Sequence, residues 1–413
     1  MIYMVSIWLT ILNIIYLVFF VIALVYYLYI NIRKKDVLND DYLKSLGKEP
    51  FVSIIVPTYN EENNIKKCLK SLKSLNYSNY EIILSDGGSQ DRTVEIAKPF
   101  VDKLIVENEV AEGWIGKNYG CHLGSEVADG ELLLFTDADT WHKPDSLRIT
   151  VSILLREKAG LYTMLPYQEM KKWWESIVPI YFFLSHITSG GIKRINDPRE
   201  HDSFLGIGQY LLFTRDAYTK IGGHVRIKGS IIEDYAFARI VKMQLHSLYY
   251  SCCDKMVHVQ MYPDSFQHCW TGFKKVLYAG TKLTPPRKIT IALIVSLLTI
   301  AAPVMIILNA LLSDLIAWPI IMANAYFLMM IAFATFWHNK GRHFWVTYLL
   351  FPFLMIFFIF TMISSTLELV ISKQTTWKGR KYKPNLRAGI NGPSKNDDSS
   401  QQSKEKNHSK SKL

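Results

Sequence analysis

The chain has 413 residues, 49% of them hydrophobic, with a formal net charge of +11 at pH 7 and five cysteines. Residues 372–413 carry 11 Lys/Arg against 3 Asp/Glu, a net +8, so the rest of the chain is nearly neutral and its charge does not indicate a nucleic-acid partner. No two cysteines have Cys-x-x-Cys spacing, which argues against a disulfide framework and predicts reduced thiols.

The N-terminal segment is the first predicted membrane element. Residues 2–30 are almost uninterrupted apolar sequence and are followed by Arg33-Lys34-Lys35. A bilayer crossing takes about 20 apolar residues. The segment exceeds the apolar part of a signal peptide, about 7–15 residues, and no small-residue cleavage site follows it. We therefore expect residues 1–35 to form an N-terminal transmembrane anchor.

Residues 50–284 form one predicted soluble domain of the α/β class. Strand-like and helix-like segments alternate along it, which predicts a mostly parallel sheet with helices on both faces. Ligands of such sheets bind beyond the carboxyl ends of the strands. Asn60 is the expected N-cap of the first helix. The predicted segments are strands at 51–57, 80–84, 103–106 and 131–136 and helices at 61–75, 91–98 and 117–128.

Three polar residues follow predicted strands at this edge: Tyr59, Asp86 and Asp137. Asp137 belongs to Asp137-Ala138-Asp139, and in an extended chain positions i and i+2 share a face, so both carboxylates would point the same way. Two charges that close repel by about 4 kcal/mol at an effective dielectric constant of roughly 20. We therefore expect a cation between them, in the first place a divalent metal that neutralises a diphosphate. Asp-x-Asp is also common in ordinary turns, so neighbouring motifs must decide.

Two further segments have the composition of nucleotide- and phosphate-binding loops. The turn Asp86-Gly87-Gly88-Ser89 lets backbone approach a ligand closely, and Asp86 can accept hydrogen bonds from a base or ribose. Lys117 opens a predicted helix, whose N-terminal N–H groups would suit a phosphate. Both segments also fit a simpler interpretation, as an ordinary strand-to-helix turn and a capped helix with a solvated lysine.

Glu233-Asp234 stands at the start of another predicted helix. One of these acids is a candidate general base, because deprotonating a hydroxyl requires a carboxylate within hydrogen-bonding reach. Adjacent acids at a helix N-terminus also serve as caps that complement the helix dipole. Gly206 and Gly208, at the start of a predicted strand 206–214, fit either a close approach of backbone to a substrate or a bulge.

Two aromatic segments of the domain indicate contact with lipid. Residues 173–184 predict a strongly apolar helix, which suits a membrane interface, an acceptor groove or core packing. Residues 261–278 mix aromatic side chains with lysines just before the next apolar segment. That composition fits a helix that lies at the bilayer surface.

The C-terminal part is predicted to be embedded in the membrane. Residues 289–337, with a break near Ser313-Asp314, and residues 344–371 are long apolar segments. Residues 285–371 therefore predict a membrane region of about three helices. Residues 372–413 form a basic tail suited to anionic headgroups, and we expect it to be disordered from about residue 392.

Charge gives two conflicting answers about membrane topology. Basic clusters at 33–35 and 286–288 flank the domain, which places it in the cytoplasm by the positive-inside rule. Four spans would then place the basic tail outside, where such a sequence is disfavoured. Either the tail is external or one of the later apolar segments does not fully cross, and Pro352 permits a kink or re-entrant turn. The prediction is a multi-pass protein of the cell membrane with a cytoplasmic domain.

Several motifs together resemble those of family-2 glycosyltransferases, over about residues 50–280. They are Val56-Pro57-Thr58-Tyr59-Asn60-Glu61-Glu62, Ser85-Asp86-Gly87-Gly88-Ser89-Gln90-Asp91, Asp137-Ala138-Asp139 and Glu233-Asp234, in the family's order and spacing. Three others are similar to a narrower group of membrane glycosyltransferases, the carotenoid (diaponeurosporenoate-type) and hopanoid-associated ones. They are Gly113-Trp114-Ile115-Gly116-Lys117, Trp270-Thr271-Gly272-Phe273-Lys274-Lys275 and Trp377-Lys378-Gly379-Arg380-Lys381-Tyr382.

The resemblance implies an inverting enzyme with an A-type, nucleotide-sugar-binding fold, flanked here by transmembrane helices. Asp137 and Asp139 would hold Mg²⁺ or Mn²⁺ against the diphosphate of a nucleotide-sugar donor, Asp139 more directly. Asp234 would take the proton of a lipid or lipid-linked acceptor, and Glu233 would support it. The nucleotide pocket would be lined by Pro57, Tyr59, Glu61 and Asp86, with Lys117 at the phosphates.

One departure from the family concerns chain length of the product. The Gln-x-x-Arg-Trp motif of processive polysaccharide synthases is absent, and Gln267-His268-Cys269-Trp270 matches it only in part. This favours transfer of one sugar or a few. The alternatives are a processive synthase of similar fold and a non-catalytic membrane scaffold, and the retained acids argue against the scaffold. The sugar, the nucleotide, the acceptor and the oligomeric state are not defined by the sequence.

Overall fold

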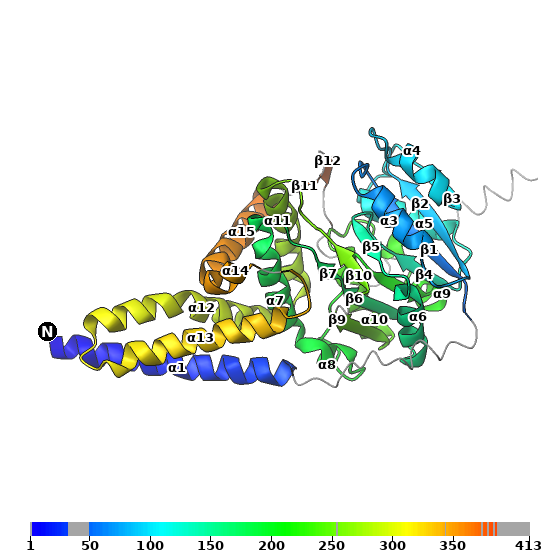
Figure 1. The fold of residues 1–413 in the computed structure, drawn as a ribbon. Helices are drawn as coiled ribbons and strands as arrows, with labels where there is room; N and C mark the ends of the chain where they lie inside the picture. Colours follow the sequence, from blue (N-terminus) through cyan, green and yellow to red (C-terminus); the bar gives the residue numbers. More distant parts are fainter. Residues whose placement is uncertain are drawn as a thin grey trace, which may run out of the picture.

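The structure is a computed structural model that describes residues 2–31, 49–252, 255–342, 344–372, 375–377, 380–382 and 385. An α/β domain lies at one end of the molecule and a bundle of long helices at the other (Figure 1). The disorder expected after residue 392 concerns residues outside the described ranges. The predicted domain boundaries stay predictions.

A seven-stranded sheet forms the centre of the α/β domain, in the order β3-β2-β1-β4-β8-β6-β9. All neighbours are parallel except β8, which is antiparallel to both β4 and β6. The predicted mostly parallel sheet is therefore confirmed. Its strands are β1 (Val52–Thr58), β2 (Tyr80–Asp86), β3 (Lys103–Val106), β4 (Leu132–Phe135), β6 (Leu161–Leu165), β8 (Leu211–Thr214) and β9 (Leu248–Cys252).

Helices cover both faces of this sheet, and alternate strand residues supply two separate cores. Ile54 and Val56 of β1 pack into one core with α3 and α6, whereas Ile55 packs into the other with α5, α7 and α10. Burial on both faces explains why the central strands are continuous apolar runs. The helices of the domain are α3 (Ile65–Lys73), α4 (Thr93–Ala97), α5 (Gly116–Glu126), α6 (Ser146–Arg156), α7 (Val178–Ser189), α8 (Gly191–Asn196), α9 (Arg215–Lys220) and α10 (Glu233–Gln244).

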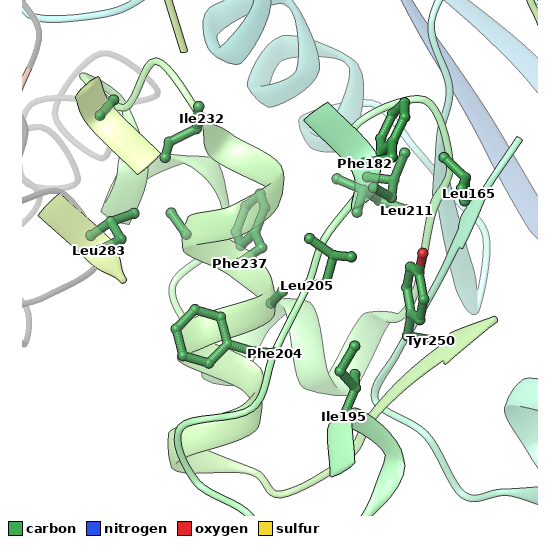
Figure 2. Packing of buried hydrophobic residues seen from close by; sticks show 14 of the residues in the cluster. Leu165, Phe182, Ile195, Phe204, Leu205, Leu211, Ile232, Phe237, Tyr250 and Leu283 are labelled. Atoms are coloured by element: carbon green, nitrogen blue, oxygen red, sulfur yellow. The ribbon is translucent and has the colours of Figure 1, made fainter. Parts of the chain in front are cut away.

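The second core continues from the sheet toward the long apolar helices. In Figure 2, Phe237 of α10 lies with Phe204, Leu205 and Ile232, and Leu283 of the next helix belongs to the same cluster. The connecting helix α11 spans Phe266–Leu283. Shorter elements complete the domain: η1 (Lys98–Phe100), η2 (Trp173–Ile177), η3 (His224–Ile227) and a small sheet of β5 (Thr140–His142), β10 (Val257–Val259) and β7 (Tyr167–Gln168).

The first helix of the domain begins later than the sequence indicates. α3 starts at Ile65 with Asn64 before it, so the prediction of Asn60 as N-cap is wrong. Asn60 instead has a left-handed backbone (φ 52°). Its backbone N–H donates to Ser89 Oγ at 2.8 Å, and its side-chain oxygen accepts from Gln90 N at 2.9 Å. Asn60 therefore links the loop after β1 to the loop after β2. Local helix propensity does not predict this link, because the two loops are neighbours only in the folded sheet.

Among the described residues, four helices are long and apolar enough to cross a membrane: α1 (Ile2–Asn31), α12 (Pro286–Leu312), α13 (Ala317–Trp337) and α15 (Phe351–Ser372). They agree with the four apolar segments and with the break near Ser313. α1, α12 and α13 lie side by side in one bundle (Figure 1). Between α13 and α15 lies α14 (Trp345–Leu349), and β11 (Thr375–Trp377) pairs with β12 (Arg380–Tyr382) after α15.

Within the bundle, a pair of amides joins α1 to α12. Asn13 Nδ2 donates to Asn309 Oδ1 at 2.7 Å, and Asn309 Nδ2 donates back to Asn13 Oδ1 at 2.9 Å. Both side chains are buried. Two reciprocal hydrogen bonds in apolar surroundings specify how the two helices align.

We expect Asn13→Leu to destabilise the bundle by about 1–2 kcal/mol, because the Asn309 amide loses its partner among apolar side chains. The double variant Asn13→Leu/Asn309→Leu should recover part of this loss, since it leaves no polar group unpaired. The measurement is the midpoint of thermal unfolding in detergent. A double variant less stable than the single one would contradict the assignment.

Candidate active site

The carboxyl ends of β1, β2 and β4 meet at one edge of the sheet, beside a cavity of about 420 Å³. Thr58 at the end of β1 is in register with Asp86 at the end of β2. The cavity brings together most of the predicted site residues from positions far apart in the chain. Those that line it are Pro57, Tyr59, Glu61, Lys117, Asp137, Asp139, Glu233 and Asp234.

Asp86 is the one predicted residue that does not line the cavity. Its Oδ1 accepts hydrogen bonds from Gly88 N at 3.0 Å and Ser89 N at 2.7 Å, and its Oδ2 accepts from Thr58 Oγ1 and Ser89 Oγ. The buried carboxylate therefore organises the glycine-rich turn, and its neighbours Ser85 and Gly87 face the cavity. A direct contact between Asp86 and a nucleotide stays a prediction.

The Asp-x-Asp segment lies in a turn between β4 and β5, so the extended geometry that would place both carboxylates on one face does not continue past β4. Thr140 holds this turn, because its Oγ1 donates to the Asp137 carbonyl oxygen at 2.7 Å. Asp137 and Asp139 nevertheless both line the cavity. The two side chains therefore reach the same cavity, as expected from the strand pattern, although the backbone between them forms a turn and not a strand.

The cation beside Asp137 is a lysine of the chain itself. Lys117 Nζ lies 2.7 Å from Asp137 Oδ1 and 2.7 Å from Glu233 Oε1. Lys117 belongs to the first turn of α5 and Glu233 to the first turn of α10, so two helix N-termini meet here. Although burial opposes its charge, the two carboxylates raise the pKa of Lys117 well above its usual value. The lysine is therefore charged and bridges β4 to α10.

Glu233 and Asp234 are adjacent, but their pKa values are shifted in opposite directions. Burial opposes the charge of Glu233, but Lys117 outweighs it and lowers the pKa of the Glu233 carboxyl. For Asp234, burial and then the charge of Glu233 raise the pKa to about 7. A carboxylate with a pKa near neutrality can accept a proton efficiently at physiological pH.

Backbone contacts hold the Asp234 carboxylate in place. Its Oδ2 accepts from Gly208 N at 2.8 Å, and its Oδ1 accepts from Tyr235 N at 2.7 Å. Gly206 has no room for a side chain, because a Cβ there would lie 2.1 Å from the Asp234 carbonyl oxygen. The two glycines therefore allow the loop to approach α10 closely. The strand predicted at 206–214 begins only at Leu211, as β8.

Three polar residues of the cavity were not singled out from the sequence for this site. Ser85 Oγ and Gln209 Oε1 are buried and have no hydrogen-bond partner among the described residues. Lys275 reaches the acids from α11, and burial lowers its pKa to about 8. Gln209 lies outside the recognised motifs, and Lys275 ends the Trp270–Lys275 motif, to which no role in this site was assigned. Only the folded chain relates the two residues to Asp137 and Glu233.

The other half of the cavity is apolar and is built by helices next to the membrane bundle. It continues from the acids along α7 and α11 to α12 and α15. A cavity with charged groups at one end and an apolar extension suits a polar donor and an apolar acceptor. Residues of the apolar part are Tyr181, Phe182, Leu184, Phe273, Val276, Leu277, Ile289, Ala292, Leu293, Phe358, Ile359 and Met362.

Comparison with known proteins identifies the domain. Residues 53–222 match the family described as Glycosyl transferase family 2. The chain carries a family-2 glycosyltransferase domain. The enzyme class predicted from the motifs is thereby confirmed, together with the use of nucleotide-sugar donors.

Two sets of curated relatives of this glycosyltransferase have the same name. A 4,4'-diaponeurosporenoate glycosyltransferase of Staphylococcus haemolyticus is 26% identical over 263 residues, which are 62% of this chain and 69% of the relative. Its namesake in Staphylococcus aureus (strain USA300) is 25% identical over 242 residues, 58% of this chain and 64% of the relative. The match thus spans about two thirds of each relative's length.

Among solved structures, a mannosyltransferase from Pyrobaculum calidifontis in complex with GDP-Man and Mn²⁺ is similar to this glycosyltransferase. The TM-score is 0.52 at 17% identity, and the match covers 90% of this chain and all of that one. At this identity the likeness concerns the fold. The predicted A-type fold is confirmed.

The carboxylates of the cavity are compatible with a divalent cation, although they do not enclose one. Asp137 and Asp139 supply hard oxygen donors, which Mg²⁺ and Mn²⁺ prefer. The described residues contain no group of three His, Cys, Asp or Glu side chains that could hold a metal by themselves. A cation here would complete its shell with diphosphate oxygens and water, as Mg²⁺ commonly does.

The charges around Asp234 predict opposite shifts of the pH profile for two substitutions. Because Glu233 raises the pKa of Asp234 and Lys117 lowers it, Glu233→Gln should move the acidic limb of kcat/KM to lower pH, and Lys117→Met to higher pH. The wild-type limb should lie near pH 7. The control is Lys220→Met, which removes an exposed lysine paired with Asp216 and should leave the profile unchanged. Shifts in the same direction for both variants would contradict this electrostatic arrangement.

Proposed function

We propose that this protein transfers one sugar, with inversion, from a nucleotide-sugar donor to a lipid or lipid-linked acceptor at the cytoplasmic face of the cell membrane. The observation that carries the proposal is the single cavity that joins Asp137, Asp139 and Asp234 to apolar side chains of α11, α12 and α15. A water-soluble acceptor would not need this apolar extension. The relatives' name, which designates diaponeurosporenoate, supports an apolar acceptor.

The donor would occupy the polar half of the cavity. Pro57, Tyr59 and Glu61 line the part next to β1, where the nucleotide would lie, and Asp86 shapes the loop beside it. Lys117 would attract the diphosphate and keep Asp137 in position. Because Lys117 already pairs with Asp137, Asp139 is the better placed ligand for Mg²⁺ or Mn²⁺. Such a cation supplies charge neutralisation for the leaving diphosphate.

Asp234 would act as the general base. Inversion requires the acceptor oxygen to approach the anomeric carbon from the side opposite the leaving diphosphate, and the acceptor proton must leave as the bond forms. Asp234 lines the cavity that joins the acids to the apolar side chains, and two backbone N–H groups fix its carboxylate. Glu233 supports it by holding Lys117 and by raising the pKa of Asp234.

We expect Asp234→Asn to lower kcat by about 10²–10⁴-fold, the usual contribution of a general base. The variant should still bind the donor, because the amide keeps the shape of the side chain. The assay is transfer from labelled UDP- and GDP-sugars to a membrane lipid extract, with one product length distinguishing single transfer from polymerisation. Asp216→Asn, an exposed acid far from the cavity, is the matched control. Wild-type turnover in Asp234→Asn would overturn the base assignment.

Chelation with EDTA should abolish transfer, and added Mn²⁺ or Mg²⁺ should restore it in the wild type. Asp139→Ala should weaken Mn²⁺ binding in the presence of nucleotide, measured by electron paramagnetic resonance, whereas Asp216→Ala should not. Full activity in EDTA would contradict metal dependence and leave the base assignment untouched.

The acceptor path can be tested at Gly280, where an added Cβ would meet no atom within 4 Å. Gly280→Leu should fill the apolar half of the cavity without displacing the fold, and should raise KM for the lipid acceptor at least several-fold. Nucleotide binding should stay unchanged, because the nucleotide would occupy the polar half of the cavity. Gly280→Ala is the control and should retain activity. Equal transfer by both variants would contradict an acceptor in this part of the cavity.

A further inference from the structure

The helix α11 lies along the catalytic domain over its whole length. At its start, the ring of Phe266 stacks on Trp173 of η2, with centroids 5.9 Å apart and an interplanar angle of 19°. At its end, Thr284 Oγ1 lies 3.0 Å from the hydroxyl of Tyr235, the neighbour of Asp234 in α10. Since both ends contact the domain, α11 runs along its surface and does not lead away from it.

The fourth apolar helix, α15, runs beside α11 in the same direction. Near the start of both helices, the rings of Phe357 and Trp270 lie 5.1 Å apart. Two turns further along, Ser365 Oγ accepts from Tyr278 N at 3.1 Å. Glu368 and Lys274 form an ion pair at 2.5 Å. α15 therefore follows α11, and Figure 1 shows it beside α11 at the domain end of the bundle.

The segment that leads into α15 is also attached to the domain. Gln168 of β7 donates its backbone N–H to the Lys340 carbonyl at 2.9 Å and accepts from Arg342 N at 2.9 Å. Thr347 of α14 hydrogen-bonds Ser176 of η2 at 3.1 Å. The chain has thus returned to the domain at the end of α13.

The segment that follows α15 is attached to the same domain. Asn385 N donates to the Gly229 carbonyl at 2.9 Å, and β11 packs against α11. The chain therefore enters and leaves α15 on one side. By contrast, α1 ends at the domain, where the Ile30 carbonyl abuts Gly191, and α12 starts there, where Lys288 contacts Asp202.

We propose that α15 lies in the plane of the membrane, so that the chain crosses the bilayer three times, with α1, α12 and α13, and the basic tail is on the side of the catalytic domain. This arrangement removes the conflict between the positive-inside rule and a count of four spans. Residues 372–413, with their net +8, then face the same leaflet as the basic residues that flank the domain.

The surface that α15 offers to the bilayer is a continuous apolar stripe. Its members recur every three or four residues, the spacing of one helix face, and Phe353 and Phe360 are 61% and 59% exposed. The opposite face is buried against the protein and includes Thr361 and Ser365. Lipid acyl chains are the partner that fits, because the stripe carries no charge and continues the apolar surface of the bundle. The stripe comprises Phe353, Ile356, Phe360, Ile363 and Leu367.

A functional consequence follows if the proposed lipid acceptor is correct. α15 contributes Phe358, Ile359 and Met362 to the wall of the cavity. An in-plane α15 places this wall at the leaflet next to the domain, so a lipid would reach Asp234 from that leaflet. The topology itself does not depend on catalysis.

The first test is accessibility of single cysteines to a membrane-impermeant maleimide in sealed inside-out vesicles, using the full chain without its native cysteines. Glu112→Cys marks the domain, Ser313→Cys the α12–α13 loop and Ser403→Cys the tail. We expect Glu112→Cys and Ser403→Cys to react together and Ser313→Cys to react only after detergent. Reaction of Ser403→Cys together with Ser313→Cys would overturn the proposal. If the chain without native cysteines does not fold, protease removal of an epitope after Leu413 in the otherwise native chain decides the same question.

The second test measures depth along α15. Spin labels at Phe353→Cys, Phe360→Cys and Leu367→Cys should lie at similar depth in the bilayer. In a spanning helix the first and last positions would differ by up to about 21 Å along the axis. A steady change of depth from 353 to 367 would overturn the in-plane helix. The inactive Asp234→Asn protein should give the same result, which separates this proposal from the proposed function.

Discussion

The arrangement of the site depends on one partly buried cation, Lys117, held between Asp137 and Glu233. The two acids belong to different halves of the domain, the end of β4 and the start of α10. Without Lys117, the carboxylates of Asp137 and Glu233 would lie close together in the cavity with no positive charge between them, and like charges repel. Burial, and then the charge of Glu233, raise the pKa of the neighbouring Asp234, whereas Lys117 lowers it.

The cavity combines two environments because two layers of the protein meet at it. The sheet and α5 provide the polar side, and α7, α11 and α15 provide the apolar side. α7 is buried between the sheet and the membrane helices, with Phe183 against Phe333 and Phe336 of α13. Its aromatic composition thus reflects packing between the α/β domain and the helix bundle. A role of α7 in an acceptor groove belongs to the proposed function.

Particular elements show where sequence reasoning succeeded. The strand predicted at 103–106 is β3 (Lys103–Val106), because a short β-branched segment between turn residues has few other conformations. The strand ends placed Pro57, Tyr59 and Asp137 at one edge, since parallel strands share the direction of their carboxyl ends. The N-cap predicted at Asn60 was wrong, and the sequence did not show that Asp86 organises the glycine-rich turn. Their side chains bind neighbouring loops, and hydrogen bonds between loops depend on which strands are adjacent.

Sequence reasoning was sufficient for the α/β sheet, the family motifs and the long apolar helices, because periodicity and hydropathy are properties of contiguous residues. The folded chain was needed to show that Lys117 lies beside Asp137, that Gln209 and Lys275 line the same cavity as the acids, and that α15 runs beside α11. These facts rest on contacts between residues tens to more than a hundred positions apart, such as Thr347 with Ser176. Hydropathy indicates that a helix prefers lipid, whereas the contacts at both of its ends indicate whether it crosses the bilayer.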